Sequence, residues 1–415
     1  MLRRRSNVAR HVLMSLGRWA RPLALAALVP VGVAACGSSS TSTTASKGPI
    51  VIGAAIAESG DLAPFDEPPL TAERLAIADI NKQGGVLGRK LKLVVVDMHS
   101  VPSDGTRAAL QVLDEGAQMV IVSCDYDTGA PAAITAQSHN EIAFSTCAAA
   151  PQFGPKGIGP LAYTMADAAQ SEGMIESQYA VKTKGCKTGY LFTDTDLAYF
   201  IGVASGWQQG FPLAGGKIVG SSSFTQAGLN APAVVDKFLA LKPTPQCALL
   251  AFNAFDGGAV LRQLRASGYK GAIFGSNSWD GNYWKSLSPN LSNFYFTDYG
   301  SIYGDDPNPA VNKLVVRWRD ANKGALPENS NLLTGYAVIQ AYAKAVEEAG
   351  SLDTAKVAAE LDKFTNVPLI VGPTTFSVPN LHITLTRPME IMQIQNGKTK
   401  YLQTIAPPKP PKVTF

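Results

Sequence analysis

The chain has 415 residues, of which 46% are hydrophobic and 16% charged, and this length suits two packed domains better than one core. Six of the 36 basic residues precede Cys36 and no acidic residue does, so the rest of the chain carries 30 basic and 32 acidic side chains. A nearly neutral body gives no electrostatic basis for binding nucleic acid, and we expect no nucleic-acid partner.

Residues 1–35 have the pattern of a signal peptide. An Arg-rich start leads into the apolar run Leu23–Ala35, which is too short to span a bilayer. The run ends in VAAC at residues 33–36, which resembles the bacterial lipobox, and residues 36–48 are polar enough for a flexible linker. We therefore expect an exported protein anchored by lipid on Cys36 at the outer face of the cytoplasmic membrane. Ordinary secretory cleavage with an incidental cysteine is the alternative.

The first stretch of the body predicts a strand, a helix and a second strand. Ile50–Ile56 is short and β-branched, as a buried strand should be. Pro68–Pro69 suits a first helical turn, and Gly84–Gly85 suits the end of the same helix. Leu91–Val96 is the second strand, so this segment is a βαβ unit, which predicts a parallel sheet.

The same alternation continues in two series, which predicts two parallel α/β sheets. The first series adds helices Ser103–Glu115 and Thr128–Asn140 and strands Met119–Ser123, Ile142–Thr146 and Leu161–Met165. The second series has helices Ala168–Val181, Ala198–Leu213, Ala231–Leu241 and Gly257–Ser267, a short helix Tyr283–Leu287, and strands Thr188–Thr193, Lys217–Phe224, Ala248–Phe252 and Ala272–Gly275.

The order of elements then changes, which predicts that the chain returns to cover the first sheet. After strand Phe294–Thr297 come helices Pro309–Lys323, Leu332–Ala349 and Thr354–Phe364, and then strands Pro373–Phe376, Thr384–Gln395 and Lys400–Gln403 with an Asn396-Gly397 hairpin turn.

These elements predict two lobes joined by three crossovers. Lobe 1 takes residues 49–163 and 298–378, lobe 2 takes residues 164–297 and 379–404, and residues 405–415 form an extended tail.

The four cysteines of the body suit disulfides in an exported protein. Cys124 and Cys147 end consecutive predicted strands, while Cys186 and Cys247 each precede one. This placement favours the pairs Cys124–Cys147 and Cys186–Cys247, with four free buried thiols as the alternative.

The usual signatures of catalysis are missing from the sequence. No GxGxxG and no GxxxxGK[ST] follow a strand, and GWQQG at residues 206–210 has glutamine where a nucleophile elbow needs serine. No cysteine has metal-ligand spacing. We therefore expect a binding protein without cofactor or metal, and an enzyme on a related α/β scaffold is the least favoured alternative.

Three segments of the sequence resemble the Leu/Ile/Val-type solute-binding proteins of bacterial ABC importers. They are ADINKQGGVLGRKLKLVVVD at residues 78–97, MVIVSCDYDTGAPAA at residues 119–133 and IVGPTTFSVPN at residues 370–380. The resemblance implies a type I periplasmic-binding-protein fold, with two Rossmann-like parallel-sheet lobes, a three-crossover hinge and a small molecule held between the lobes. It also implies ABC permease subunits as partners and a monomeric protein.

The resemblance also implies site residues, carried over position by position. Where relatives hold a carboxylate with small hydroxyl residues, this chain has Tyr126, Thr128 and Ala149, and where they hold the ammonium with an acid it has Asn277. The aromatic residues at matching positions are Phe65, Tyr199 and Phe255, and Trp279 is expected at the edge of the cleft.

The expected site lacks a well-placed acid, although Asp256 or Asp280 could substitute for one. Burying an ammonium group without a partner costs several kcal/mol. Two ligand classes therefore stay open, namely branched-chain amino acids and less zwitterionic molecules such as aromatic acids, amides or apolar carboxylates. Delivery to an importer is the favoured role, and a ligand sensor for a membrane signalling partner is the alternative.

Overall fold

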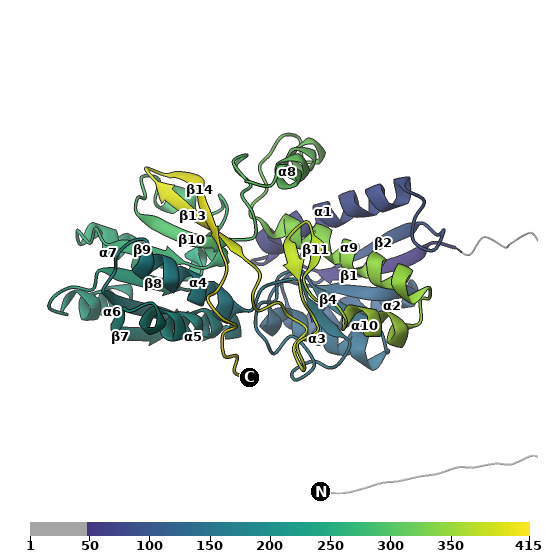
Figure 1. The fold of residues 1–415 in the computed structure, drawn as a ribbon, viewed down its shortest axis with the longest axis horizontal. Helices are drawn as coiled ribbons and strands as arrows, with labels where there is room; N and C mark the ends of the chain where they lie inside the picture. The colour runs from purple at the N-terminus through teal and green to yellow at the C-terminus, as the bar shows by residue number, and fades with distance from the viewer. Residues whose placement is uncertain (1–47) are drawn as a thin grey trace, which may run out of the picture. The chain divides into compact units, whose positions relative to one another are not determined.

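The computed structural model describes residues 48–415, apart from the side chains of Asp256 and Leu287. The predicted signal peptide, Cys36 and nearly all of the predicted linker lie outside the described residues. The described chain forms two large β-sheets with flanking helices and one small two-stranded sheet (Figure 1).

Lobe 1, as we use the term, is built on the first sheet, which has the strand order β2-β1-β3-β4-β5 and is parallel throughout. Its strands are apolar runs without alternation because helices cover both faces. The strands and their helices are β1 (Ile50–Ile56), α1 (Ala63–Lys82), β2 (Leu91–Asp97), α2 (Pro102–Asp114), β3 (Ala117–Val122), α3 (Tyr126–Ser138), β4 (Ile142–Ser145) and β5 (Ala162–Thr164).

Lobe 2 is built on the second sheet, which has the order β14-β13-β10-β9-β8-β6-β7. Its elements are α4 (Ala169–Lys182), β6 (Thr188–Asp194), α5 (Ala198–Leu213), β7 (Lys217–Phe224), α6 (Ala231–Leu239), β8 (Cys247–Ala251), α7 (Ala254–Ala266), β9 (Ala272–Gly275), the 3-10 turns η1 (Asn277–Trp279) and η2 (Lys285–Leu287), β10 (Phe294–Asp298), β13 (Met389–Gln395) and β14 (Lys398–Ile405).

The second sheet is parallel from β7 to β10 and antiparallel beyond, where β13 and β14 form a hairpin. Asn396 and Gly397 turn this hairpin with φ values of 51° and 72°, which confirms the predicted turn. The predicted hairpin therefore makes the otherwise parallel lobe 2 sheet mixed, because a two-residue connection joins only antiparallel strands.

Helices α4 and α5 pack against each other with almost no space between their backbones. A Cβ atom on Gly173 would lie 2.0 Å from the carbonyl oxygen of Val203, and one on Gly206 would lie 2.0 Å from that of Gln170. Both glycines are therefore required by close approach of the helices, and α4 is held firmly where it enters lobe 2.

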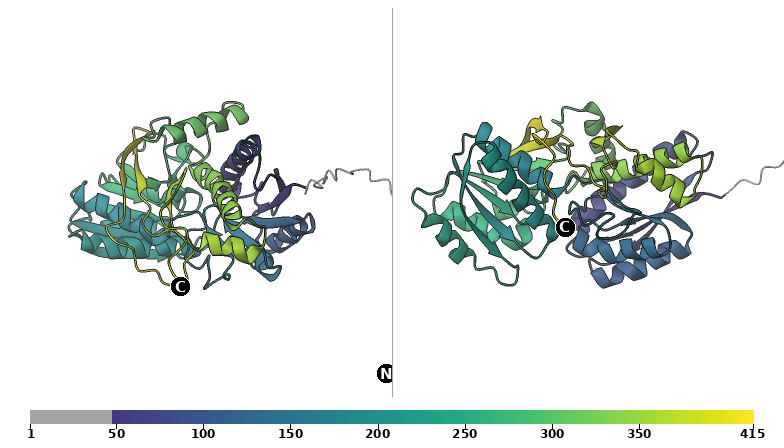
Figure 2. Two further views of the ribbon diagram at one scale, coloured as in Figure 1. Left: turned by 45° about the vertical axis from the view of Figure 1, so that its right-hand side comes forward. Right: turned by 60° about the horizontal axis from the view of Figure 1, so that its bottom comes forward.

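The block after the second sheet returns to lobe 1, as Figures 1 and 2 show for the green helices α9 and α10 beside the purple and blue elements. Helix α8 also contacts α1, where Arg317 pairs with Asp79 at 2.7 Å and Trp318 Nε1 donates to the Pro68 carbonyl. The elements of this block are α8 (Pro309–Ala321), α9 (Asn331–Ala349), α10 (Thr354–Leu361), β11 (Val367–Leu369) and β12 (Gly372–Thr374).

A buried arginine ties two of the three segments that connect the lobes. Arg387, 1% exposed, donates to the carbonyl oxygen of Met165 at 2.8 Å and pairs with Asp167 at 3.4 Å. Its other nitrogens bond Pro373 O and Thr374 Oγ1. The first and third crossovers are therefore held together at one point of the hinge.

Two element boundaries differ from expectation by more than the others. Helix α1 begins at Ala63 rather than near Pro68, so both prolines lie inside the helix. Prolines there leave carbonyl groups of the preceding turn without intrahelical donors, and Asn329 Nδ2 donates to the Pro64 carbonyl instead, at 2.7 Å. The strand expected from Thr384 begins at Met389, because the segment before it forms the third crossover.

Candidate ligand-binding site

A cavity of about 70 Å³ lies where the carboxyl ends of both parallel sheets face each other. It has room for several water molecules or part of a small ligand. Lobe 1 contributes Leu62, Phe65, Cys124, Asp125, Cys147 and Ala149, lobe 2 contributes Glu172, Leu197, Tyr199, Phe200, Asn253, Asn277 and Ser278, and the second crossover and the start of α9 contribute Tyr299 and Asn331. Ligands of open parallel sheets are expected at this edge.

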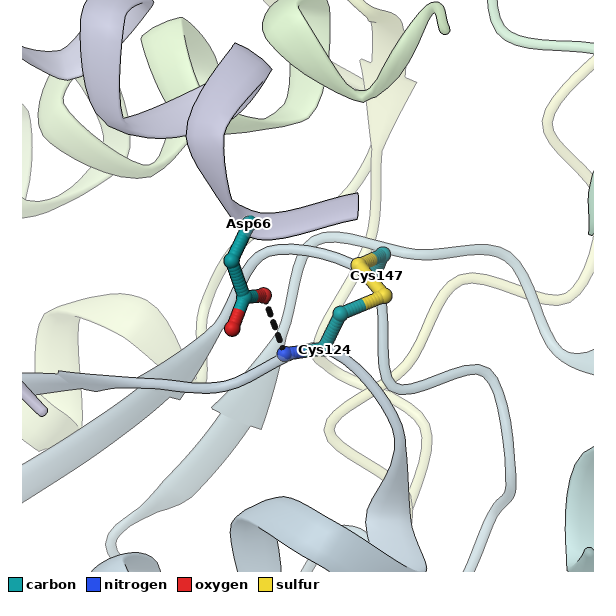
Figure 3. Close-up of side chains that lie close together, drawn as sticks. All are labelled: Asp66, Cys124 and Cys147. Carbon is teal, nitrogen blue, oxygen red and sulfur yellow. Dashed lines mark hydrogen bonds between the residues drawn. A yellow bond between two sulfur atoms is a disulfide. The ribbon is translucent and has the colours of Figure 1, made fainter. Parts of the chain in front are cut away.

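The lobe 1 wall is organised by the buried carboxylate of Asp66, in the first turns of α1 (Figure 3). One of its oxygens accepts from Ala57 N at 2.8 Å and Ser123 Oγ at 2.6 Å, and the other accepts from Cys124 N at 2.7 Å. Burial raises the pKa of Asp66 to about 7, although these three donors act in the opposite direction. Asp66 thereby joins α1 to the ends of β1 and β3.

Two disulfides are present, with the pairing expected from the sequence. Cys124 and Cys147 have Cα atoms 4.9 Å apart, and Cys186 and Cys247 have Cα atoms 6.0 Å apart. Because both Cys124 and Cys147 line the cavity, the first disulfide is part of its wall. The same sulfurs lie near Asp66, but a disulfide offers no thiolate to a metal ion.

The lobe 2 wall carries an acid that reasoning from the sequence missed. Glu172 lies in the first turn of α4, is fully buried and lines the cavity. Its Oε2 accepts from Tyr199 Oη at 2.7 Å and from Asn277 N at 3.1 Å. Its Oε1 accepts no hydrogen bond from the described part of the chain.

Burial raises the pKa of Glu172 to about 8, the strongest effect on this group, while the Tyr199 hydroxyl and the Asn277 amide oppose it. At pH 7 the side chain of Glu172 in the free protein is therefore mostly protonated. A cation next to Oε1 would favour the charged form.

Two further groups of the cavity wall are hydrogen-bond acceptors, although hydroxyl and amide groups that can donate, such as those of Tyr299, Ser278 and Asn253, also line it. Oδ1 of Asn331 is buried without a donor from residues 48–415, and Asp125 adds a second carboxylate. Within the same residues, the lining includes no lysine, arginine or histidine. A ligand that brings its own N–H donors and a positive charge matches this lining.

Four of the residues expected from the sequence do line the cavity: Phe65, Ala149, Tyr199 and Asn277. Their roles in binding stay predictions. The backbone N–H of Asn277 bonds the acid Glu172, so this loop contacts an acid without supplying it.

The remaining expected residues lie elsewhere. Tyr126 packs against the core of lobe 1, and Thr128 is half-buried without lining the cavity, since α3 begins at Tyr126 rather than at Thr128. Phe255 is 53% exposed and stacks on Tyr283 with ring centroids 4.8 Å apart. The side chain of Asp256 lies outside the described part of the chain.

Trp279 and Asp280 are corrected. Trp279 is fully buried in the lobe 2 core, where it packs on Phe252 and Trp284 and its Nε1 donates to Leu250 O. Asp280 is not a cavity acid, because its Oδ2 accepts from the backbone N–H of Ser330 at 2.5 Å. Both follow from the 3-10 turn η1, which folds this loop inward.

The lobes also touch across the cleft. Oδ2 of Asp127, in α3, accepts from the backbone N–H of Ala198 at 3.1 Å. Ala198 is the first residue of α5, a helix without a side-chain cap of its own. A lobe 1 acid therefore caps a lobe 2 helix, and this contact requires the two lobes to be close.

Comparison with known proteins defines the class. Residues 49–399 match the family model described as periplasmic binding protein, and the chain belongs to this family. The family consists of solute-binding proteins rather than enzymes, which confirms the expectation of a binding protein. The type I fold implied by the resemblance is also confirmed.

Curated relatives carry amino-acid-binding names. The Leu/Ile/Val-binding protein homolog 3 of Brucella melitensis biotype 1 is 24% identical over 333 residues, covering 79% of this chain and 87% of that relative. An "Amino acid binding protein" of Pseudomonas aeruginosa is 27% identical over 330 residues, covering 78% and 84% of the two chains.

Solved structures show the same fold. The substrate binding protein LivJ of a Streptococcus pneumoniae branched-chain amino acid transporter, in complex with isoleucine, superposes with a TM-score of 0.74 at 20% identity, covering 86% of this chain and all of that one. An R. palustris ABC transporter solute binding protein in complex with benzoate gives 0.70 at 18% identity, covering 87% and 97%. Periplasmic binding proteins are exported. Within residues 48–415, no helix is long and apolar enough to cross a membrane.

Proposed function

We propose that this protein is a lipid-anchored, monomeric binding protein that captures a small apolar amino acid between its lobes and delivers it to an ABC importer. The observation that carries the ligand class is Glu172, a buried acid whose Oε1 accepts no hydrogen bond from the described residues and which lines a cavity whose described lining contains no basic side chain. A primary ammonium group on the ligand would pair with this oxygen.

This lining favours amine-bearing ligands over the aromatic and apolar carboxylates that the sequence left open. A carboxylate without an amine would place a negative charge beside Glu172 and Asp125 with no cationic side chain to offset it. An amino acid brings its own ammonium, and its carboxylate could bond backbone N–H groups at the first turn of α3, which follows Asp125 directly.

Capture between lobes is supported by the Asp127–Ala198 hydrogen bond, which exists only when α3 and α5 are close. The apolar part of the ligand would lie among Leu62, Phe65 and Phe200. Burying one Leu-sized side chain supplies about 1.5–3 kcal/mol, so a small aliphatic side chain is a suitable partner for these walls.

The test is a thermal-shift and calorimetry panel with ligands that differ by one group. L-leucine and L-leucinamide both keep the amine, isocaproate keeps the aliphatic chain and the carboxylate, and benzoate is an aromatic acid. We expect the first two to raise the melting temperature, as a ligand that binds only the folded state must. A rise in melting temperature with isocaproate or benzoate, and none with L-leucine or L-leucinamide, would contradict the proposal that the ligand carries an amine.

The anchor and the transport role need separate tests. Replacing Cys36 by alanine should release the protein from the membrane fraction, with retention there counting against lipid attachment. Loss of uptake of the identified ligand on deletion of the gene would support delivery to an importer. Unchanged uptake with an altered transcriptional response would instead favour the sensor alternative.

A further inference from the structure

The two disulfides differ in where they lie in their sheets. Cys124 and Cys147 follow the carboxyl ends of β3 and β4, line the ligand cavity, and are 9% and 8% exposed. Cys186 precedes β6 and Cys247 begins β8, at the opposite edge of the lobe 2 sheet, where Cys247 has no exposed surface. A small molecule that enters the cavity therefore meets the first disulfide.

A buried carboxyl group stands beside that disulfide. An oxygen of Asp66 and the sulfur atoms of Cys124 and Cys147 all lie within 4.8 Å of one another (Figure 3). Asp66 is 1% exposed and accepts three hydrogen bonds from two segments, the ends of β1 and β3, so its position is fixed. Asp66 supports the wall of the ligand site from behind and is not among the residues that line the cavity.

We propose that Cys124–Cys147 is a thiol-exchange site, reached by low-molecular-weight thiols through the ligand cavity, with Asp66 as its proton donor. Exchange between a thiol and a disulfide depends on access to the sulfur atoms and on stabilisation of the thiolate that leaves. The cavity supplies the access, and Asp66 supplies the proton.

The step balances without any further reactant. The thiolate of the small thiol attacks one cysteine sulfur, the S–S bond breaks, and a mixed disulfide forms on that cysteine. The other sulfur leaves as a thiolate and takes the proton of Asp66, which becomes a carboxylate. A second thiol molecule can then release the oxidised small-molecule disulfide and leave two protein thiols.

Opening the bond should weaken ligand binding, and this part rests on the proposed function. The disulfide joins the loops after β3 and β4, which carry Asp125 and Ala149 to the cavity. Without the cross-link these loops regain conformational freedom that the ligand must then remove. The strands themselves stay paired through their parallel ladder, so lobe 1 should stay folded.

The experiment exposes the purified exported protein to reduced glutathione, quenches with iodoacetamide and identifies labelled cysteines by peptide mass spectrometry. We expect labelling and glutathione adducts at Cys124 and Cys147 at least about tenfold faster than at Cys186 and Cys247, because an accessible disulfide exchanges faster. Equal rates at the two disulfides, or faster reaction of Cys186–Cys247, would overturn the proposal.

The role of Asp66 is tested by the pH profile of exchange, corrected for the thiolate fraction of glutathione. Wild-type protein should show an inflection near pH 7, and Asp66→Asn should lose it and react about tenfold more slowly. Asp61→Asn is the control, because Asp61 is an exposed acid just before the same helix. The same inflection in both variants would overturn the assignment of Asp66.

L-leucine separates this proposal from the proposed function. Slower exchange at Cys124–Cys147 with saturating L-leucine would support both. Selective exchange that neither L-leucine nor L-leucinamide slows would overturn the link to amino-acid binding and would still support the exchange site.

Discussion

The two walls of the cavity are built in different ways. On lobe 1, Asp66 and the Cys124–Cys147 disulfide fix loops that would present backbone groups and small side chains. On lobe 2, the buried acid Glu172, to which we assign the ligand's ammonium group, is held by Tyr199 and by the backbone of Asn277. The difference teaches that the fixed loops and the acid of one cavity can come from separate lobes. The two walls then meet only when the lobes are close.

The largest effect should come from removing the frame of lobe 1. Asp66→Ala leaves three buried donors without an acceptor, each worth about 1–3 kcal/mol, so we expect the free energy of unfolding to fall by about 4 kcal/mol. Urea denaturation measures this loss. Asp61→Ala, at an exposed acid just before the same helix, is the control, and an equal loss there would contradict the framing role.

A change on the lobe 2 wall should affect binding instead of stability. Glu172→Gln removes the charge while keeping the shape, and we expect the Kd for L-leucine to rise about 100-fold, or about 3 kcal/mol, because a desolvated ammonium loses its partner. Calorimetry measures the change. Glu176→Gln alters a buried acid one turn further along α4 that does not line the cavity, and a similar loss there would contradict the assignment.

The raised pKa of Glu172 predicts how the affinity for the ligand changes with pH. Because the free protein holds this proton up to about pH 8, affinity for an ammonium ligand should fall about 50-fold between pH 8 and pH 6. Calorimetry across this range, in buffers of different ionisation enthalpy, should also detect release of a proton on binding at pH 7.

Stability of the ligand-free protein should change in the opposite direction. An acid whose pKa is raised by folding binds more protons in the folded state, so its contribution to stability decreases as pH rises from about 4.5 to about 8. Asp66, whose pKa is raised to about 7, acts in the same sense. If lowering the pH decreased both the affinity for the ligand and the stability of the ligand-free protein, this account would be contradicted.

The smallest effect should come from the contact that joins the walls. Asp127→Ala removes the cap of α5 only in the closed state, so the L-leucine dissociation rate should rise about threefold, or by about 0.5–1 kcal/mol. Stopped-flow kinetics measures this rate. Asp196→Ala, in the loop before α5, is the control, because its carboxylate bonds Gln226 within lobe 2.

Reasoning from the sequence predicted the strand edge at which the cavity lies but did not single out the acid that lines it. The ends of β3 and β4 were predicted at Ser123 and Thr146 and each lies one residue earlier, so apolar runs alone placed the edge where ligands of parallel sheets are expected. The search for an acid considered only loops after lobe 2 strands. Glu172 lies on a helix, and its spacing of one turn from Glu176 beside Met174 and Ile175 was the available signal.

Loop residues were the least predictable part of the site. Trp279 and Asn277 are two positions apart, yet one is buried in the core and the other lines the cavity. No periodicity distinguishes them, because a short 3-10 turn fixes the direction of each side chain.

The sequence by itself determined the βαβ alternation, the return of the last helices to lobe 1 and the family, and it favoured the observed pairing of the cysteines. These features depend on local pattern and on the order of elements, both of which can be read from the sequence. Only the tertiary structure decided that Glu172 faces the cavity, that Asp66 stands beside a disulfide and that Asp127 caps the opposite lobe. Each of these is a contact between segments distant in the chain, and burial at such contacts sets both the direction and the charge of a side chain.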